Sequence, residues 1–139
     1  MERSPELEDL ALKLYEAVSS ADAAFFERYL SRGESCVVIG TAPDEWWEDY
    51  AAALDPIRKQ MASVGDAVKL VAGDVRAYCE GAVGWVADQP TLKVGSVAAL
   101  CRHTSVFVRE AGEWRIVQHH FSIGVSNHEV FGSEAGKLG

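Results

Sequence analysis

The chain has 139 residues, of which 48% are hydrophobic and 24% charged, a composition typical of one folded domain with a sizeable core. The 21 Asp and Glu residues outnumber the 13 Lys and Arg residues, which gives a formal net charge of −8. A surface of this sign repels phosphate backbones and anionic lipids, and no apolar run approaches the roughly 20 residues of a membrane-spanning helix. We therefore expect no nucleic-acid or membrane partner, and a cytoplasmic location.

The beginning of the chain predicts two helices. Ser4 followed by Pro5 is a helix-start signal, and apolar residues at 3.6-residue spacing predict a helix over Pro5–Ser19. Asp22 can cap a second helix, which Gly33 ends.

The next segment predicts a strand and then a helix. The β-branched run "SCVVIG" (35–40) indicates a short strand, and "TAPDEWWEDYAAALDPIRKQM" (41–61) has helix-forming composition with Asp44 as its N-cap. Proline lacks an amide hydrogen and clashes with the preceding turn, so Pro56 predicts a break of this helix at Asp55.

The pattern changes to a period of two from Ala67 onward, which predicts strands. Four consecutive strands form an antiparallel meander, with Gly73 marking a bulge in the first of them. Their expected ranges are 67–81, 82–94, 96–110 and 113–125. Helices followed by such a sheet predict an α+β domain over residues 1–132, with 133–139 as a flexible tail.

Three stretches carry a resemblance to a known family: "GTAPDEWWEDY" (40–50), "GDVRAYCEGAVGWVADQPT" (73–91) and "TSVFVREAGEWRIVQHHFSIGVSNHEVFG" (104–132). Together they resemble the SnoaL-like branch of the nuclear transport factor 2-like superfamily. The resemblance implies a cone-shaped α+β barrel of the cystatin-like type, with N-terminal helices packed on a strongly bent antiparallel sheet. It also implies a small apolar molecule in the cone and a homodimer formed through the outer face of the sheet.

The adjacent pair His119 and His120 cannot converge on one substrate atom, because neighbours in a strand point to opposite faces. The resemblance implies that Val117, His119 and Phe121 face the cone, with His120 on the outer face. A bulge in the strand would reverse this assignment.

Two residues are candidate proton carriers. His119 can act as a general acid or base, or it can be a hydrogen-bonded interior histidine. Asp88 ends the apolar strand segment "GWVAD", where desolvation would suit it to proton abstraction; the alternative is a solvated strand-end carboxylate. The isomerases of the superfamily place their catalytic carboxylate near the position of Thr104, and this departure argues against isomerase chemistry.

Aromatic and apolar residues complete the expected pocket. Two adjacent tryptophans on a helix diverge by about 100°, so only one of them is expected to face the ligand, and core packing is the alternative role for both. The expected lining residues are Trp46, Tyr50, Val86, His103, Val117 and Phe121. The chain has no nucleotide-binding or zinc-protease motif, and its three cysteines are widely spaced, so no cofactor and no metal site are expected.

Three functions follow as hypotheses. The first is a domain that binds a small apolar molecule, with no assigned reaction. The second is a cofactor-independent isomerase, dehydratase or cyclase that uses Asp88 and His119 as proton carriers. The third is an association module that only dimerises.

Overall fold

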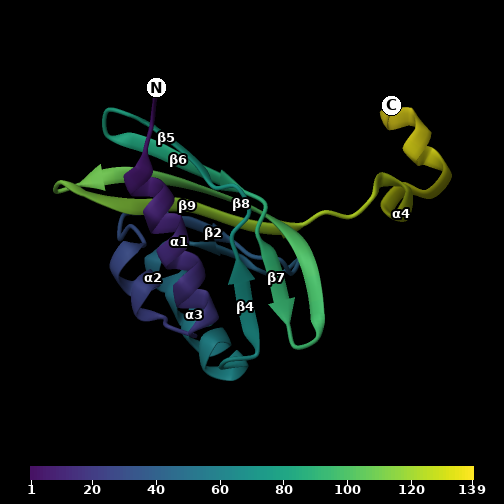
Figure 1. Cartoon of the computed structure of the whole chain (residues 1–139), viewed down its shortest axis with the longest axis horizontal. Helices are drawn as coiled ribbons and strands as arrows, with labels where there is room; N and C mark the ends of the chain where they lie inside the picture. Colours follow the sequence, from purple (N-terminus) through teal and green to yellow (C-terminus); the bar gives the residue numbers. More distant parts are fainter.

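Three helices pack against one face of a bent nine-stranded sheet (Figure 1). The computed structural model describes all 139 residues. The helices are α1 (Pro5–Ser19), α2 (Ala24–Tyr29) and α3 (Tyr50–Val64). The predicted α+β class, with N-terminal helices covering a strongly curved sheet, is confirmed.

The strands are short except for two long ones at the centre of the sheet. They are β1 (Glu2–Arg3), β2 (Val37–Ile39), β3 (Trp46–Glu48), β4 (Val68–Val71), β5 (Arg76–Glu80), β6 (Val83–Asp88), β7 (Thr91–Val94), β8 (Val97–Glu110) and β9 (Glu113–Ile123).

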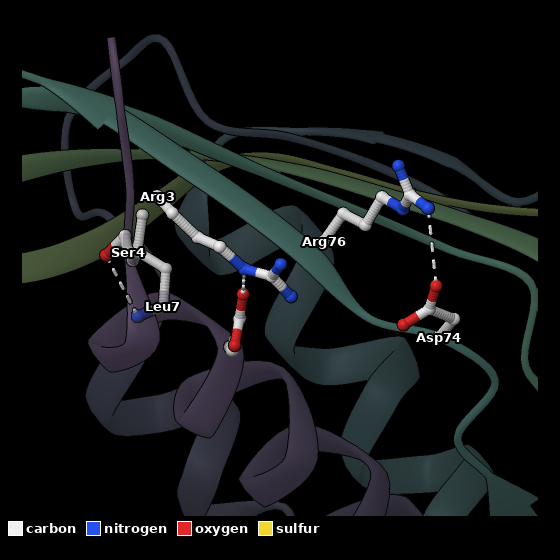
Figure 2. Close-up of polar contacts among 6 residues, drawn as sticks. Arg3, Ser4, Leu7, Asp74 and Arg76 are labelled. Atoms are coloured by element: carbon white, nitrogen blue, oxygen red, sulfur yellow. Dashed lines mark hydrogen bonds and ion pairs between the residues drawn. The ribbon is translucent and has the colours of Figure 1, made fainter.

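The first helix begins as the sequence predicts. The Ser4 hydroxyl accepts a hydrogen bond from the Leu7 amide at 3.3 Å (Figure 2), and Pro5 occupies the first turn, where its missing amide hydrogen is not needed. The neighbouring Arg3 donates to Glu8 at 2.7 Å. One face of the helix is buried against the sheet through Leu7, Leu10, Ala11, Leu14, Tyr15 and Ala17.

The start of the third helix differs from its prediction. Trp46–Glu48 forms strand β3, which pairs antiparallel with β2, and the helix begins only at Tyr50. Its N-cap is Asp49, whose carboxylate accepts from the Ala52 amide at 2.9 Å, so the assignment of Asp44 was wrong. The predicted helix began too early because residues 41–49 have helix-forming composition. In the structure, pairing of Trp46–Glu48 with β2 outweighs this helical propensity.

Helix α3 also continues through Pro56, where a break was expected. The helix buries Ala53, Leu54, Ile57 and Met61 on both sides of the proline, and this packing holds the two halves in line. Ala52, whose carbonyl loses its helical partner, lies on the exposed face, where solvent can replace the missing bond.

The meander is present, but its first two predicted strands are each divided into two. The chain breaks between β4 and β5 and between β6 and β7, whereas β8 runs through and pairs with β6 in one half and β7 in the other. The sheet bends at these breaks. Gly73 lies at the first break, where a Cβ would be 2.6 Å from the Gln89 carbonyl oxygen, so only glycine fits there. The sheet is mixed, since β2 runs parallel to β9.

Strand β9 contains a bulge at Val117. On one side Val106 pairs with Gln118, and on the other Phe107 pairs with Ile116, so Val117 has no partner. Alternation restarts at the bulge, and Ile116 and His119 therefore face the same side of the sheet.

The chain ends in α4 (Asn127–Phe131) and the 3₁₀-helix η1 (Gly132–Leu138), which project away from the rest of the molecule (Figure 1). Helical structure therefore extends through the segment that was expected to be a tail. None of the helices has the length and apolar character needed to cross a membrane.

Candidate functional site

A cavity of about 320 Å³ lies between α3 and the inner face of the sheet. Thirteen of its 18 lining residues are hydrophobic, which suits an apolar ligand. The apolar part of the wall includes Val18, Phe26, Val38, Trp47, Ile57, Met61, Val64, Leu70, Leu92 and Phe121.

His119 is the one buried polar side chain on this wall. Its ring lies between two phenylalanines, with centroids 6.1 Å from Phe26 and 5.1 Å from Phe121. Only 6% of the residue is exposed. Phe121 in turn stacks on the His103 ring at 4.6 Å with an interplanar angle of 11°, and so separates His103 from the cavity.

A second polar group of the wall is the partly buried Glu45. Its carboxylate accepts from the Ala42 amide at 2.8 Å and from the Gln60 side chain at 3.2 Å. A Cβ on Gly40 would lie 2.9 Å from the Glu45 side chain, so glycine at position 40 makes room for this carboxylate. Glu45 is the only charged residue of the lining, which contains no Lys or Arg.

A continuous line of buried polar side chains lies behind His119. Tyr15 Oη donates to Asp88 Oδ2 at 2.9 Å and lies 2.8 Å from His103 Nδ1. The other nitrogen of His103 lies 2.8 Å from Ser105 Oγ, which is 2.9 Å from His119 Nδ1. We call these five residues the relay.

The sheet register assembles the relay. Asp88 on β6 is paired with His103 on β8, and Ser105 on β8 is paired with His119 on β9. Residues 103 and 105 share one face because they are two apart in a strand. Tyr15 reaches this face from α1, and the Gly73 and Gln89 amides donate to Asp88 at 3.1 and 2.8 Å.

Burial sets the charge states of the relay. It lowers the pKa of His119 to about 4, with a smaller contribution from His120, and it lowers the pKa of His103 well below its ordinary value, with a smaller contribution from His119. Burial and the adjacent Asp88 raise the pKa of Tyr15. Both histidines and the phenol are therefore neutral at pH 7.

Comparison with known proteins identifies the family. The sequence pattern of the SnoaL-like domain matches residues 7–126. The chain belongs to the SnoaL-like domain family. A search of curated proteins finds no match.

Solved structures share the fold of this SnoaL-like domain at low sequence identity. A nuclear transport factor 2-like protein of unknown function from Pseudomonas putida KT2440 is 15% identical, with a TM-score of 0.76 over 87% of this chain and 86% of that one. A provisionally assigned dehydratase from Streptomyces avermitilis is 18% identical, with a TM-score of 0.72 over 87% and 96%. A provisionally assigned calcium/calmodulin-dependent protein kinase type II association domain from Thiobacillus denitrificans is 20% identical, with a TM-score of 0.67 over 90% and 98%.

The SnoaL-like domain brings two of the predicted site residues, His119 and Phe121, to the cavity wall. Asp88 is buried but does not line the cavity; it reaches His119 only through three intervening side chains. His103 is part of the relay and is covered by Phe121. Neither Asp88 nor His103 therefore lines this cavity.

The other predicted lining residues lie elsewhere. Trp46 is 59% exposed, and its neighbour Trp47 faces the cavity instead, because the two alternate across strand β3. Tyr50 donates to the Glu27 carbonyl at 2.9 Å, outside the cavity lining. Val86 is a core residue, and Val117 occupies the bulge.

Ser105 was not among the predicted site residues, and Tyr15 was not among the predicted proton carriers. The signal for Ser105 is the alternation in β8, where Cys101, His103, Ser105 and Phe107 are all buried. Two polar residues at inward positions of a strand indicate an internal hydrogen-bond network. Tyr15 carries no such signal, because it continues the apolar stripe of α1.

Proposed function

We propose that this SnoaL-like domain binds a small, uncharged, largely apolar molecule in the cavity between α3 and the sheet, with His119 as its inner polar contact. The supporting observation is a neutral imidazole on the wall of an otherwise apolar cavity. A volume of about 320 Å³ is at the small end of ligand pockets, which suits a molecule of about ten carbon atoms.

The charges around the cavity argue for a neutral ligand. A carboxylate would have to leave water for a wall with no Lys or Arg, where Glu45 would repel it. Burying a charge without a partner costs several kcal/mol. Fatty acids and other organic anions are therefore poor candidates.

The two competing hypotheses have weaker support. A general base works best when its pKa lies near the working pH, whereas burial lowers the pKa of His119 to about 4. The second expected proton carrier, Asp88, does not reach the cavity. An association module needs no cavity, and its inner face would be filled by its own side chains.

Three ten-carbon compounds test the proposal by thermal unfolding: menthol, its ketone menthone and the anion citronellate. A ligand that binds only the native state raises the free energy of unfolding by mass action, by about 3 kcal/mol at a concentration 100 times Kd, and so raises the melting temperature. We expect menthol to raise it and citronellate to leave it unchanged.

A pair of variants controls the site of binding. Val64 lines the cavity, whereas Ser63 next to it is exposed, so Val64→Trp should abolish the menthol response and Ser63→Trp should retain it. No response to either menthol or menthone, or a full response in Val64→Trp, would overturn the proposal.

A further inference from the structure

The hydrogen positions in the relay follow from its two ends. Each intermediate group stands between two hydrogen-bond partners, and a phenol, a serine hydroxyl or a neutral imidazole carries one mobile hydrogen for them. Each group therefore donates to one partner and accepts from the other. Fixing the direction of one bond fixes the direction of all of them.

Asp88 fixes that direction. Its carboxylate is surrounded by donors only: the amides of Gly73 and Gln89 and the phenol of Tyr15. The phenol hydrogen therefore points to Asp88, since two bare oxygens 2.9 Å apart would repel each other. The Tyr15 oxygen then accepts a hydrogen from Nδ1 of His103.

The same argument carries the direction to His119. A neutral His103 with its hydrogen on Nδ1 has a lone pair on Nε2, which must accept from the Ser105 hydroxyl. The Ser105 oxygen then accepts from His119, whose hydrogen is consequently on Nδ1. His119 is left with a lone pair on Nε2.

This lone pair faces the cavity. Nε2 of His119 has no hydrogen-bond partner within the chain, and the only fully buried side-chain polar atoms without a partner are Trp114 Nε1 and Arg115 Nη1. Nε2 is therefore in contact with open volume, and the volume that His119 lines is the cavity.

We infer that Asp88, acting through Tyr15, His103 and Ser105, holds His119 in the Nδ1–H tautomer, and that the cavity consequently selects neutral ligands with a hydroxyl donor over ligands with only a carbonyl acceptor. The selection rests on the proposed function, whereas the tautomer does not. Asp88, Tyr15, His103 and Ser105 are positioning residues, because none of them touches the ligand.

The nitrogen chemical shifts of His119 test the tautomer without any ligand. Long-range ¹H–¹⁵N spectra of the labelled protein at pH 7 should show a protonated Nδ1 and a bare Nε2. Tyr15→Phe removes the hydroxyl between Asp88 and His103, and should give a mixture of tautomers at His119, three residues along the relay. Tyr50→Phe is the matched control, since it removes a phenol hydrogen bond outside the relay and should leave the spectrum unchanged.

Menthol and menthone test the selection, because they share a skeleton and differ in whether they donate. We expect the wild type and Tyr50→Phe to bind menthol about tenfold more tightly, as one hydrogen bond of about 1.4 kcal/mol implies, and Tyr15→Phe to lose most of this preference.

The outcomes separate the two proposals. An Nε2–H tautomer in the wild type, or equal binding of the two compounds, overturns the inference while binding in the cavity stands. Binding of neither compound overturns the proposed function and the selection, and the wild-type spectrum still decides the tautomer even if Tyr15→Phe does not fold.

Discussion

The cavity and the relay meet at His119 but are built in opposite ways. The cavity wall is mostly hydrophobic and encloses about 320 Å³ of open volume. The relay is polar and filled, with every link between 2.8 and 2.9 Å.

The difference explains why binding and positioning can be separated in this fold. An unfilled cavity with an apolar wall can accept ligands of several shapes, since apolar contact is not directional. A buried hydrogen-bonded line holds one arrangement, because any break leaves a polar group without a partner in a low-dielectric interior. Changes in the relay should therefore affect stability strongly, and changes in the cavity should affect binding.

Asp88→Ala should produce the largest loss of stability. It removes the acceptor of three buried or half-buried donors, so we expect the free energy of unfolding to fall by about 4 kcal/mol in urea denaturation. Asp74→Ala is the control, since Asp74 is 81% exposed and its ion pair with Arg76 lies at the surface (Figure 2). It should change stability by less than about 0.5 kcal/mol, and equal effects of the two substitutions would contradict a structural role for the relay.

Acidification should destabilise the fold through His119. The pKa of His119 is about 4 in the folded protein, whereas an unperturbed histidine, as in the unfolded chain, has a pKa of 6.5. The unfolded chain therefore binds a proton first as the pH falls. The contribution of His119 to the free energy of unfolding is fully present above pH 6.5. It is lost as the pH falls from about 6.5 to 4, and the total loss is roughly 3 kcal/mol. His103, whose pKa is also lowered by burial, acts in the same direction.

Substitution isolates this contribution. The fall in unfolding free energy from pH 7 to pH 4 should be smaller in His119→Gln than in the wild type, whereas His128→Gln, at an exposed position, should match the wild type. The same pH dependence in all three proteins would show that His119 is not buried in its neutral form.

The smallest effect is expected in tryptophan fluorescence. Trp47 lines the cavity and Trp46 is exposed, so a non-fluorescent ligand such as menthol should shift only the emission of Trp47 to shorter wavelength. The shift should disappear in Trp47→Phe and persist in Trp46→Phe. The opposite pattern would move the ligand to the outer side of β3.

Local sequence signals predicted much of the fold. Helix α1 has the predicted bounds because Ser4, Pro5 and a regular apolar stripe agree with one another. The prediction for the region around Trp46 and Asp49 was wrong because the composition of this segment favours a helix. The strand observed there depends on pairing with β2, which the composition of the segment does not reveal.

The candidate site was only partly predictable for the same reason. His119 and Phe121 were found through the alternation of one strand and a family resemblance. The relay requires the register of three strands and the placement of α1 across them, so Tyr15 and Ser105 could not be connected to Asp88 from sequence alone.

The bulge at Val117 has a consequence for how the chain can vary in length. Since Val117 has no cross-strand partner, a chain lacking it would form an uninterrupted ladder with Ile116 and His119 still facing inward. Relatives one residue shorter at this point can therefore keep the same interior histidine. If Val117 were instead paired regularly with Val106, Gln118 would lie opposite Ser105 in the place of His119, and His119 would face outward. A one-residue gap in an alignment at this point therefore decides whether His119 aligns with the interior position.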